Sequence, residues 1–254
     1  MGKAQALRAR LADVADAVLS VVLAPACAAC AQVLEKPTQG PVCEACWQSI
    51  RPLTPPLCER CGDPLATWRP AAAPAALCPR CRRARRYVDR GRAIGAYDGA
   101  LRAIIHALKY EGRRSLARPL GALMRCRGAD LLDGAACAIP VPLHGWRRRQ
   151  RGFNQAADLA GEIGLPVLAA LRRVRATESQ IALPAARRHR NVRDAFAATG
   201  DAARLAGSIV VLIDDVSTTG ATLEACARVL KESGVREVRA LTAARVVAAG
   251  DRRS

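Results

Sequence analysis

The chain has 254 residues, of which 51% are apolar, and its 40 Lys and Arg against 22 Asp and Glu give a formal net charge of +18. This length fits one or two domains, and the composition excludes disordered, collagen-like and coiled-coil proteins, because the apolar residues suffice for a core and follow no fixed repeat. All but four of the basic residues are Arg, an excess that fits either nucleic-acid binding or the coding bias of a G+C-rich genome.

Residues 1–24 are predicted to form an amphipathic helix that packs on the rest of the protein. Its apolar residues recur at helical spacing, at Leu7, Leu11, Val14, Val18 and Leu19. The apolar run 18–24 is far shorter than the roughly 20 residues that cross a bilayer, and Asp13 and Asp16 interrupt any signal-peptide core. A faint lipoprotein cleavage pattern ends at Cys27, but the helix explains the segment better. We therefore expect a cytoplasmic protein without a membrane span.

Eight of the 11 cysteines form four Cys-x-x-Cys pairs within a predicted Cys-rich module at residues 25–85. The pairs are separated by 12, 11 and 16 residues, and they are Cys27/Cys30, Cys43/Cys46, Cys58/Cys61 and Cys78/Cys81. Two such pairs supply the four sulfur ligands of one tetrahedral structural zinc ion. We predict two structural Zn²⁺ sites with four Cys each, and the spacing leaves open whether consecutive or interleaved pairs share an ion.

Two alternatives for these cysteines fit less well. Disulfides are rare in a reducing cytoplasm, and one redox-active pair would not explain four. The module is also rich in proline and poor in apolar periods, so bound metal is expected to supply much of its folding free energy. Four thiolates close the coordination sphere, which excludes catalysis at these ions.

Residues 86–254 are predicted to form an α/β domain, a parallel sheet with helices on both faces. Strand-like and helix-like segments alternate, at residues 92–97, 101–108, 116–124, 136–141, 153–163, 208–213, 222–233 and 238–243. The three remaining cysteines lie in apolar surroundings and are expected to be buried: Cys126, Cys137 and Cys226. Ligands of such a sheet bind at the carboxyl ends of its strands.

The sharpest motif spans residues 209–222, where a buried strand is followed by two acids and a hydroxyl-rich loop that enters a helix. The carboxylates of Asp214 and Asp215 suit the vicinal hydroxyls of a ribose. The loop offers backbone N–H groups, hydroxyls and a helix N-terminus to a phosphate, from Ser217, Thr218, Thr219, Gly220, Ala221 and Thr222. No Lys follows, so this is not a nucleoside-triphosphate loop. A plain capped helix would not explain the paired acids.

This motif resembles the phosphoribosyl pyrophosphate (PRPP) signature of type I phosphoribosyltransferases. The resemblance implies a type I phosphoribosyltransferase-like parallel sheet flanked by helices, with PRPP bound together with Mg²⁺. It also implies that Asp214 and Asp215 are the candidate catalytic residues, and the sequence does not choose between them.

Further motifs extend the resemblance along the chain: His106-Ala-Leu-Lys-Tyr-Glu-Gly112, Ile139-Pro-Val-Pro-Leu-His144 and Arg151-Gly-Phe-Asn-Gln155. With the cysteine pairs in front of them, the chain resembles the ComF family of competence proteins from end to end. That family couples an N-terminal zinc ribbon to a phosphoribosyltransferase domain. The resemblance implies a role in DNA uptake during natural transformation, with single-stranded DNA or a competence helicase as further partners.

The remaining site candidates are cations and amides expected near the pyrophosphate. The loop at residues 141–155 matches the pyrophosphate loop of this fold, and the polar connection around residues 187–193 resembles its mobile hood. The candidates are Lys109, Arg147, Arg148, Arg149, Arg151, Asn154, Arg187 and Asn191. Each Arg has a solvated basic loop as its alternative.

Two classes of function follow from the sequence. The chain either transfers or senses the phosphoribosyl group, or it is a non-catalytic protein that binds single-stranded DNA or docks on the competence machinery. The basic residues 82–92 favour the second class, whereas the few aromatic residues, 3% of the chain, give little support to base stacking.

Overall fold

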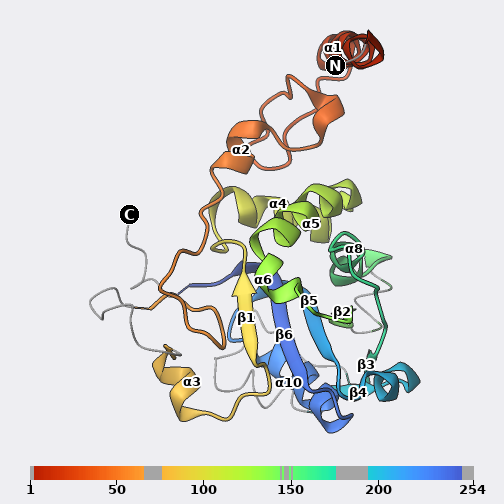
Figure 1. The fold of residues 1–254 in the computed structure, drawn as a ribbon. Coiled ribbons are helices and arrows are strands. Elements are labelled where there is room, and N and C mark those ends of the chain that lie inside the picture. The colour runs from red at the N-terminus through yellow and green to blue at the C-terminus, as the bar shows by residue number, and fades with distance from the viewer. Residues whose placement is uncertain are drawn as a thin grey trace. The chain divides into compact units, whose positions relative to one another are not determined.

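The computed structural model describes residues 3–65, 76–143, 145, 149, 151–175 and 194–247, without the side chains of residues 3–10. The chain divides into two compact units, each assembled from two stretches of sequence (Figure 1). The first consists of Met1–Ile50 and Asp98–Leu116, and the second of Arg51–Tyr97 and Ala117–Ser254. This division places two of the Cys-x-x-Cys pairs in each unit.

The first unit is helical. Its elements are α1 (Lys3–Val22), the 3-10 turn η1 (Pro37–Gln39), α2 (Glu44–Gln48), α4 (Gly99–Tyr110) and the 3-10 turn η2 (Arg114–Leu116). Helix α4 carries a strongly apolar side, and Leu101, Ile104, Ile105 and Leu108 are completely buried. Helix α2 contacts α4, so the segment that carries the second cysteine pair of this unit lies against the distant segment 98–116.

The predicted packing of α1 is wrong. Three positions of its apolar stripe are exposed: Leu11, Val14 and Val18; the side chain of Leu7 lies outside those described. The helix packs instead through a polar face, on which the buried carboxylate of Asp16 accepts hydrogen bonds from the N–H and the hydroxyl of Thr38 at 2.7 and 2.9 Å. The hydroxyl of Ser20 donates to the carbonyl of Leu34 at 3.1 Å. These contacts prevail because η1 and the chain before it present backbone groups that need polar partners.

The second unit is built on a four-stranded, fully parallel sheet, which confirms the predicted α/β class. Its strand order is β1-β6-β5-β2, with β1 (Arg90–Ala93), β2 (Cys137–Pro140), β5 (Ile209–Ser217) and β6 (Glu237–Arg245) (Figure 1). The two central strands pair from Ile209↔Glu237 to Ser217↔Arg245 and are buried along almost their whole length. A long apolar run is what a strand covered on both faces requires.

Helices flank this sheet. Helix α10 (Ala221–Glu232) buries Cys226 and Leu230 in one core cluster with Val210 and Leu212 of β5. On β6, Leu241 points the other way, where a Cβ at Gly128 would meet its methyl groups at 2.6 Å. Helices α5 (Ala117–Arg127), α6 (Ala129–Leu132) and α8 (Gln155–Gly161) complete the cover.

Every segment predicted between residues 92 and 243 coincides with an observed strand or helix, although the ends differ. The largest difference is at β1, which spans Arg90–Ala93 and so ends four residues before the predicted segment does. Strand β5 continues beyond residue 213 to Ser217 because its pairing with β6 continues, so Asp214 and Asp215 lie within the strand. The sequence missed the short helix α3 (Pro79–Arg83), the antiparallel pair β3 (Leu171–Arg173) and β4 (Phe196–Ala198), and the 3-10 helix η3 (Gly200–Leu205).

Burial of the three isolated cysteines is confirmed for Cys137 and Cys226, whereas Cys126 is exposed on α5. Its neighbours in sequence, Arg125 and Arg127, are basic and lie in the last turn of the same helix. In the described part of the chain, no helix is both long enough and apolar enough to cross a membrane.

Candidate functional site

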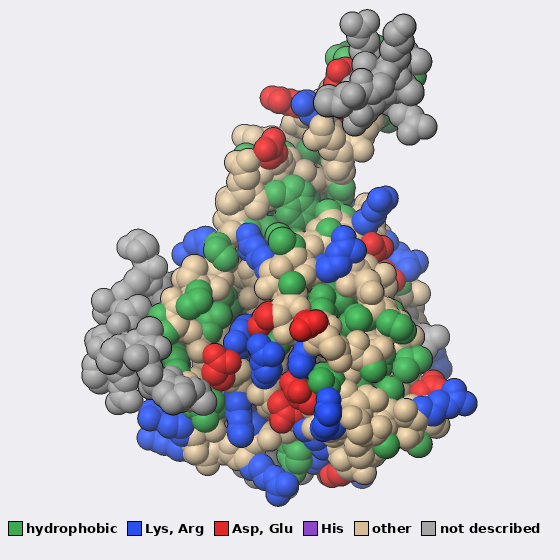
Figure 2. Space-filling model, viewed as in Figure 1, with side chains coloured by type: hydrophobic (Ala, Val, Ile, Leu, Met, Phe, Trp, Pro, Cys, Tyr) green, Lys and Arg blue, Asp and Glu red, His purple; other side chains and the backbone are tan. Residues whose placement is uncertain are grey.

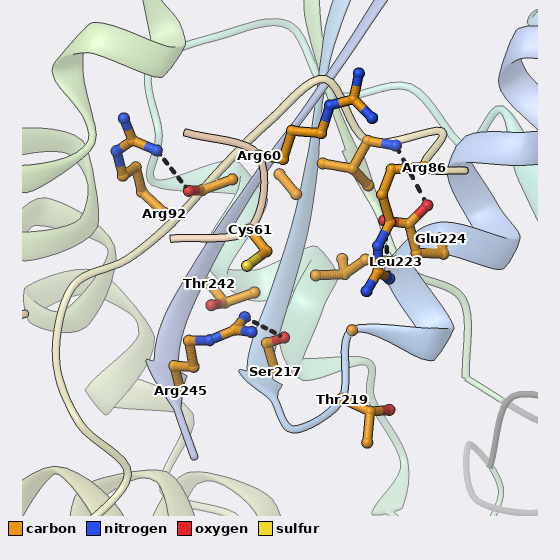
Figure 3. Close-up of a pocket in the computed structure, with 14 residues that line it drawn as sticks. Arg60, Cys61, Arg86, Arg92, Ser217, Thr219, Leu223, Glu224, Thr242 and Arg245 are labelled. Atoms are coloured by element: carbon orange, nitrogen blue, oxygen red, sulfur yellow. Dashed lines mark hydrogen bonds and ion pairs between the residues drawn. The ribbon is translucent and has the colours of Figure 1, made fainter. Parts of the chain in front are cut away.

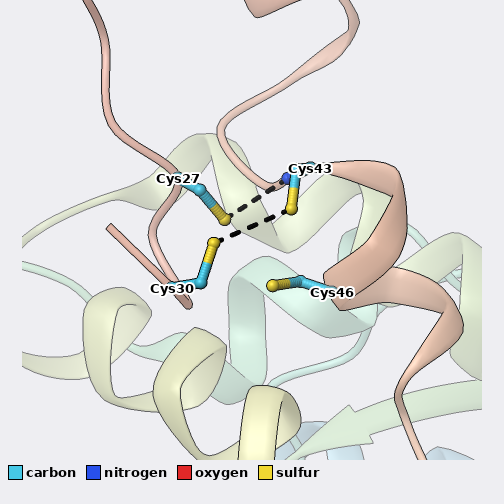
Figure 4. Close-up of side chains that lie close together, drawn as sticks. All are labelled: Cys27, Cys30, Cys43 and Cys46. Carbon is cyan, nitrogen blue, oxygen red and sulfur yellow. Dashed lines mark hydrogen bonds between the residues drawn. The ribbon is translucent and has the colours of Figure 1, made fainter. Parts of the chain in front are cut away.

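The eight paired cysteines form two clusters in consecutive order, which answers the pairing question that the spacing left open. Cys27, Cys30, Cys43 and Cys46 form the first cluster, and Cys58, Cys61, Cys78 and Cys81 form the second. In each cluster the sulfurs all lie within 4.8 Å of one another, and Figure 4 shows the four side chains of the first converging on one point. Four convergent thiol groups are the donor set of a structural zinc ion.

In the first cluster, backbone N–H groups donate to the sulfur of Cys27 and lower its pKa. The sulfur of Cys27 accepts hydrogen bonds from the N–H groups of Ala29 and Cys43, both at 3.4 Å. Burial alone would raise the pKa of Cys27, but these two N–H groups, together with hydrogen bonds from the backbone and side chain of Cys30, outweigh it and lower the pKa to about 6. The thiolate that zinc requires is therefore favoured at neutral pH.

The second cluster is more buried, and its sulfurs interact more strongly. Hydrogen bonds from the thiols of Cys61 and Cys81 lower the pKa of Cys58, and the hydrogen bond to Cys58 raises the pKa of Cys81 to about 12. Without a metal ion, the thiols of Cys61 and Cys81 therefore keep their protons and donate to the thiolate of Cys58. Four thiolates at this site would need a divalent cation to balance their charge. Both clusters fit Zn²⁺, and zinc binding to four-cysteine sites of this kind is generally coupled to folding.

The second candidate site is the turn from β5 into α10. Asp215 is only 7% exposed, and a carboxylate oxygen of the half-buried Asp214 accepts the N–H of Asp215 at 2.9 Å. Gly220 adopts the left-handed conformation, with φ +78°, and is the N-cap of the twelve-residue helix α10. The hydroxyl of Thr219 accepts the N–H of Ala221 at 3.3 Å.

This arrangement has two chemically distinct ends. The carboxylates offer oxygen acceptors for hydroxyl groups and hard ligands for Mg²⁺, so the residues present fit that ion. The helix N-terminus offers unsatisfied N–H groups and the positive end of a dipole to an anion. Ser217 at the end of β5 is buried, whereas Thr218 and Thr222 are half-buried on either side of Gly220.

The other predicted site residues are dispersed. Arg147, Arg148, Arg187 and Asn191 lie outside the described residues. Lys109 lies in the last turn of α4, in the first unit. Arg149 is exposed and Arg151 is half-buried.

Asn154 has a structural position. It is the N-cap of α8, where its side-chain oxygen accepts the N–H of Ala156 at 3.2 Å. Its amide nitrogen donates to the carbonyl of Val141 at 3.1 Å. Asn154 thus ties the two ends of the predicted pyrophosphate loop together.

Acids partner much of the basic stretch at residues 82–92. Arg86, Arg90 and Arg92 form ion pairs with Glu224, Asp130 and Glu59, at 3.5, 3.0 and 3.2 Å. On the face shown in Figure 2, blue and red side chains are interspersed. Three further arginines of the stretch are exposed: Arg82, Arg83 and Arg85. These three are the members most accessible to a nucleic acid.

A small cavity of about 30 Å³ lies beside the turn from β5 into α10 (Figure 3). It has room for a water molecule or a small ion but not for a nucleotide-sized ligand, which needs hundreds of Å³. Arg245, Ser217 and Glu224 line it together with Cys61 of the second cluster. Sequence analysis missed Arg245 and Glu224 because their partners are distant in the sequence.

Glu224 holds residues 86–87, which follow the second cysteine cluster in the sequence, against α10. Its carboxylate accepts the N–H of Tyr87 at 2.7 Å and pairs with Arg86. Burial raises the pKa of Glu224, and the hydrogen bond from Tyr87 and the charge of Arg86 offset part of that rise. The only sign of Glu224 in the sequence was that it is an acidic residue in the first turn of a predicted helix. Such a residue by itself indicates only a favourable interaction with the helix dipole, not a buried contact.

Two protein families match separate parts of the chain. Residues 18–82 match the double zinc ribbon domain, and residues 150–253 match the phosphoribosyl transferase domain. The first match supports Zn²⁺ as the metal of the two cysteine clusters. The second covers the strand with the two acids, the phosphate-loop motif and α10.

Several relatives are similar over most of the chain. Competence protein F of Haemophilus influenzae is 30% identical over 207 residues, which cover 78% of this chain and 87% of that protein. The DNA utilization protein YhgH of Salmonella typhimurium is 31% identical over 210 residues, with the same two coverages. Competence protein ComFC of Bacillus subtilis is 27% identical, and the match covers 76% of this chain and 79% of that protein.

Proposed function

Because the chain belongs to the ComF family of competence and DNA utilization proteins, we propose that its phosphoribosyltransferase domain binds PRPP together with Mg²⁺. One observation carries the proposal. Asp214 and Asp215 on β5 are followed, within one continuous turn, by the left-handed Gly220 and the N-terminus of α10. A ribose 5-phosphate has a diol at one end and a phosphate at the other, which matches this order of groups.

In this proposal each part of the turn binds one part of the ligand. The carboxylates of Asp214 and Asp215 accept hydrogen bonds from the ribose hydroxyls. The N–H groups of the loop and the hydroxyls of Thr218, Thr219 and Thr222 hold the 5′-phosphate. Mg²⁺, when bound, neutralises part of the charge on the pyrophosphate and keeps most of its water ligands.

We further propose that the bound ligand is either transferred or sensed. In the transfer reaction, a nucleophile on the acceptor forms a bond to the anomeric carbon. The bond from that carbon to pyrophosphate breaks, and pyrophosphate leaves with the electron pair. Arginines of the predicted pyrophosphate loop, including Arg149 and Arg151, would stabilise the departing charge, and Asp214 or Asp215 would accept the acceptor's proton.

Calorimetric titration of the zinc-loaded protein with PRPP tests the binding step. We expect saturable binding that requires Mg²⁺ and weakens at least about tenfold in Asp214→Asn and Asp215→Asn, because each variant removes a charged hydrogen-bond acceptor. Asp201→Asn is the matched control, since this acid lies on the 3-10 helix η3 and forms an ion pair with the exposed Arg204, away from the turn. Unchanged binding by both site variants would refute the assignment. Release of pyrophosphate across a panel of acceptors then separates transfer from sensing.

A second candidate function is single-stranded DNA binding, supported by the exposed Arg82, Arg83 and Arg85 and by the relatives named for competence and DNA utilization. In this second candidate function, the protein acts in the cytoplasm together with a competence helicase. Binding should weaken steeply with salt, and replacing the three arginines by Ala should reduce the salt slope by roughly 0.7 for each phosphate that is no longer neutralised. A flat salt dependence would contradict the role of these arginines.

A further inference from the structure

The second cysteine cluster and the phosphate-loop turn belong to the same unit, and the backbone around Gly62 touches β1 directly. A Cβ at Gly62 would lie 2.6 Å from the carbonyl oxygen of Gly91, and a Cβ at Gly91 would lie 2.9 Å from the carbonyl oxygen of Arg60. No side chain separates the two backbones at this point. The position of this turn relative to the sheet is therefore fixed by close packing.

Asp63 extends this contact to other elements. It follows the zinc-ligand candidate Cys61 by two residues, and one of its carboxylate oxygens lies 3.3 Å from the Cys61 sulfur. The same oxygen accepts a hydrogen bond from Arg80, between the third and fourth cysteines of the cluster, at 2.7 Å. The other oxygen pairs with the guanidinium Nε of Arg245 at the end of β6. One carboxylate thus joins both halves of the second cluster to the sheet.

Arg245 continues the connection to the phosphate-loop turn. Its side chain is only 4% exposed, and its Nη1 donates to the hydroxyl of Ser217 at 3.2 Å, as Figure 3 shows. The backbone carbonyl of Ser217 also accepts the N–H of Val246 at 2.9 Å. Ser217 is the last residue of β5, so the loop that follows begins at a residue held by both side-chain and backbone contacts from the end of β6.

The buried charge of Arg245 makes the connection depend on the second cluster. Among the described residues, Asp63 is the carboxylate that pairs with Arg245. Without it a nearly fully buried guanidinium would lack a counter-ion, which strongly destabilises the position that Arg245 holds here. Asp63 keeps its position only while the turn that carries Cys61 is folded, and metal binding is what folds such a turn.

We propose that Asp63 and Arg245 are positioning residues through which zinc at the second cluster holds the phosphate loop in its binding shape. Occupancy of that cluster then sets the affinity for the phosphate group of the ligand. The first cluster, which belongs to the other unit, contributes no residue to this chain of contacts among those described. The consequence for affinity rests on the proposed PRPP site, whereas the effect on the loop itself does not.

Hydrogen–deuterium exchange of the zinc-loaded full chain tests the positioning role without any ligand. In Asp63→Asn we expect two zinc ions still bound and amide exchange over residues 217–222 faster by about tenfold, because the loop loses its anchor. Glu59→Gln is the matched control, since Glu59 lies in the same cluster region and pairs with Arg92 at 3.2 Å without reaching the loop. Exchange within about twofold of the wild type in a zinc-replete Asp63→Asn variant would overturn the proposal.

Selective loss of each metal gives the second measurement. Cys61→Ser, in the second cluster, should speed exchange over residues 217–222, and Cys30→Ser, in the first, should leave it unchanged. If Cys61→Ser fails to fold, the Asp63→Asn result still decides the question. We expect the PRPP dissociation constant of Asp63→Asn to rise about tenfold. Absence of PRPP binding in the wild type would refute the proposed function, while the exchange data would still test the anchor.

Discussion

The close approach of Gly62 to β1 predicts a specific loss of stability in Gly62→Ala. Gly62 has φ +70°, and an alanine there would place its Cβ 2.6 Å from the Gly91 carbonyl oxygen and 3.2 Å from the Arg92 Cα. Both neighbours are backbone atoms and cannot rotate away. The left-handed conformation costs an alanine about 1–2 kcal/mol, and overpacking adds about 1–3 kcal/mol.

Gly207→Ala separates the two contributions. Gly207 has nearly the same backbone angle, φ +73°, but a Cβ there would meet nothing within 4 Å. It should therefore lose only the conformational part, and the free energies of unfolding of the two variants should differ by about 1–3 kcal/mol.

Urea unfolding of both zinc-loaded variants, followed by circular dichroism, measures this difference. Zinc content determined on the same samples separates weakened packing on β1 from loss of the metal. Equal unfolding midpoints for Gly62→Ala and Gly207→Ala would refute the idea that the second cluster is packed backbone to backbone on the sheet.

Three further predictions concern other parts of the chain. Asp16→Ala should destabilise the first unit by about 1–3 kcal/mol, because the N–H and hydroxyl of Thr38 lose their acceptor, and urea unfolding measures the loss. Iodoacetamide at about pH 8 should label the exposed Cys126 and leave Cys226 unlabelled, since burial both hides the Cys226 thiol and raises its pKa. Mass spectrometry after raising the pH to about 9 should still find no label on Cys226. Elemental analysis should find two zinc ions per chain, and strong chelation should remove both and abolish cooperative unfolding of the cysteine-rich segments; a single ion would contradict the two clusters.

The features predicted well from the sequence are those encoded locally. The Cys-x-x-Cys pairs lie close in the sequence, so their spacing alone indicated two four-cysteine clusters. The apolar run of β5 and the amphipathic pattern of α10 bracket the phosphate-loop motif and placed it correctly between a strand and a helix. The strand order required the structure, because it depends on pairings such as Arg90↔Arg239.

The features that escaped prediction depend on partners remote in the sequence. Asp63 and Arg245 are 182 residues apart, and no local pattern marks them as a pair. The apolar stripe of α1 predicted its packing face, yet the buried side is the one that carries Asp16, because a backbone segment needing hydrogen bonds lies against it. Periodicity identifies an apolar face but not what the rest of the chain offers to it.

The strand order has a consequence for the timing of folding during synthesis. The ligands of the first cluster are complete once Cys46 has been made, so that metal site can close early. Strand β1, against which the second cluster packs, pairs with β6, and β6 ends only at Arg245, long after Cys81 in the sequence. Because domains fold as units while the ribosome adds residues one by one, the second cluster must wait until β6 has been synthesised before it has a sheet to pack on. A nascent chain that stalls before β6 would carry one closed metal site and one without its support.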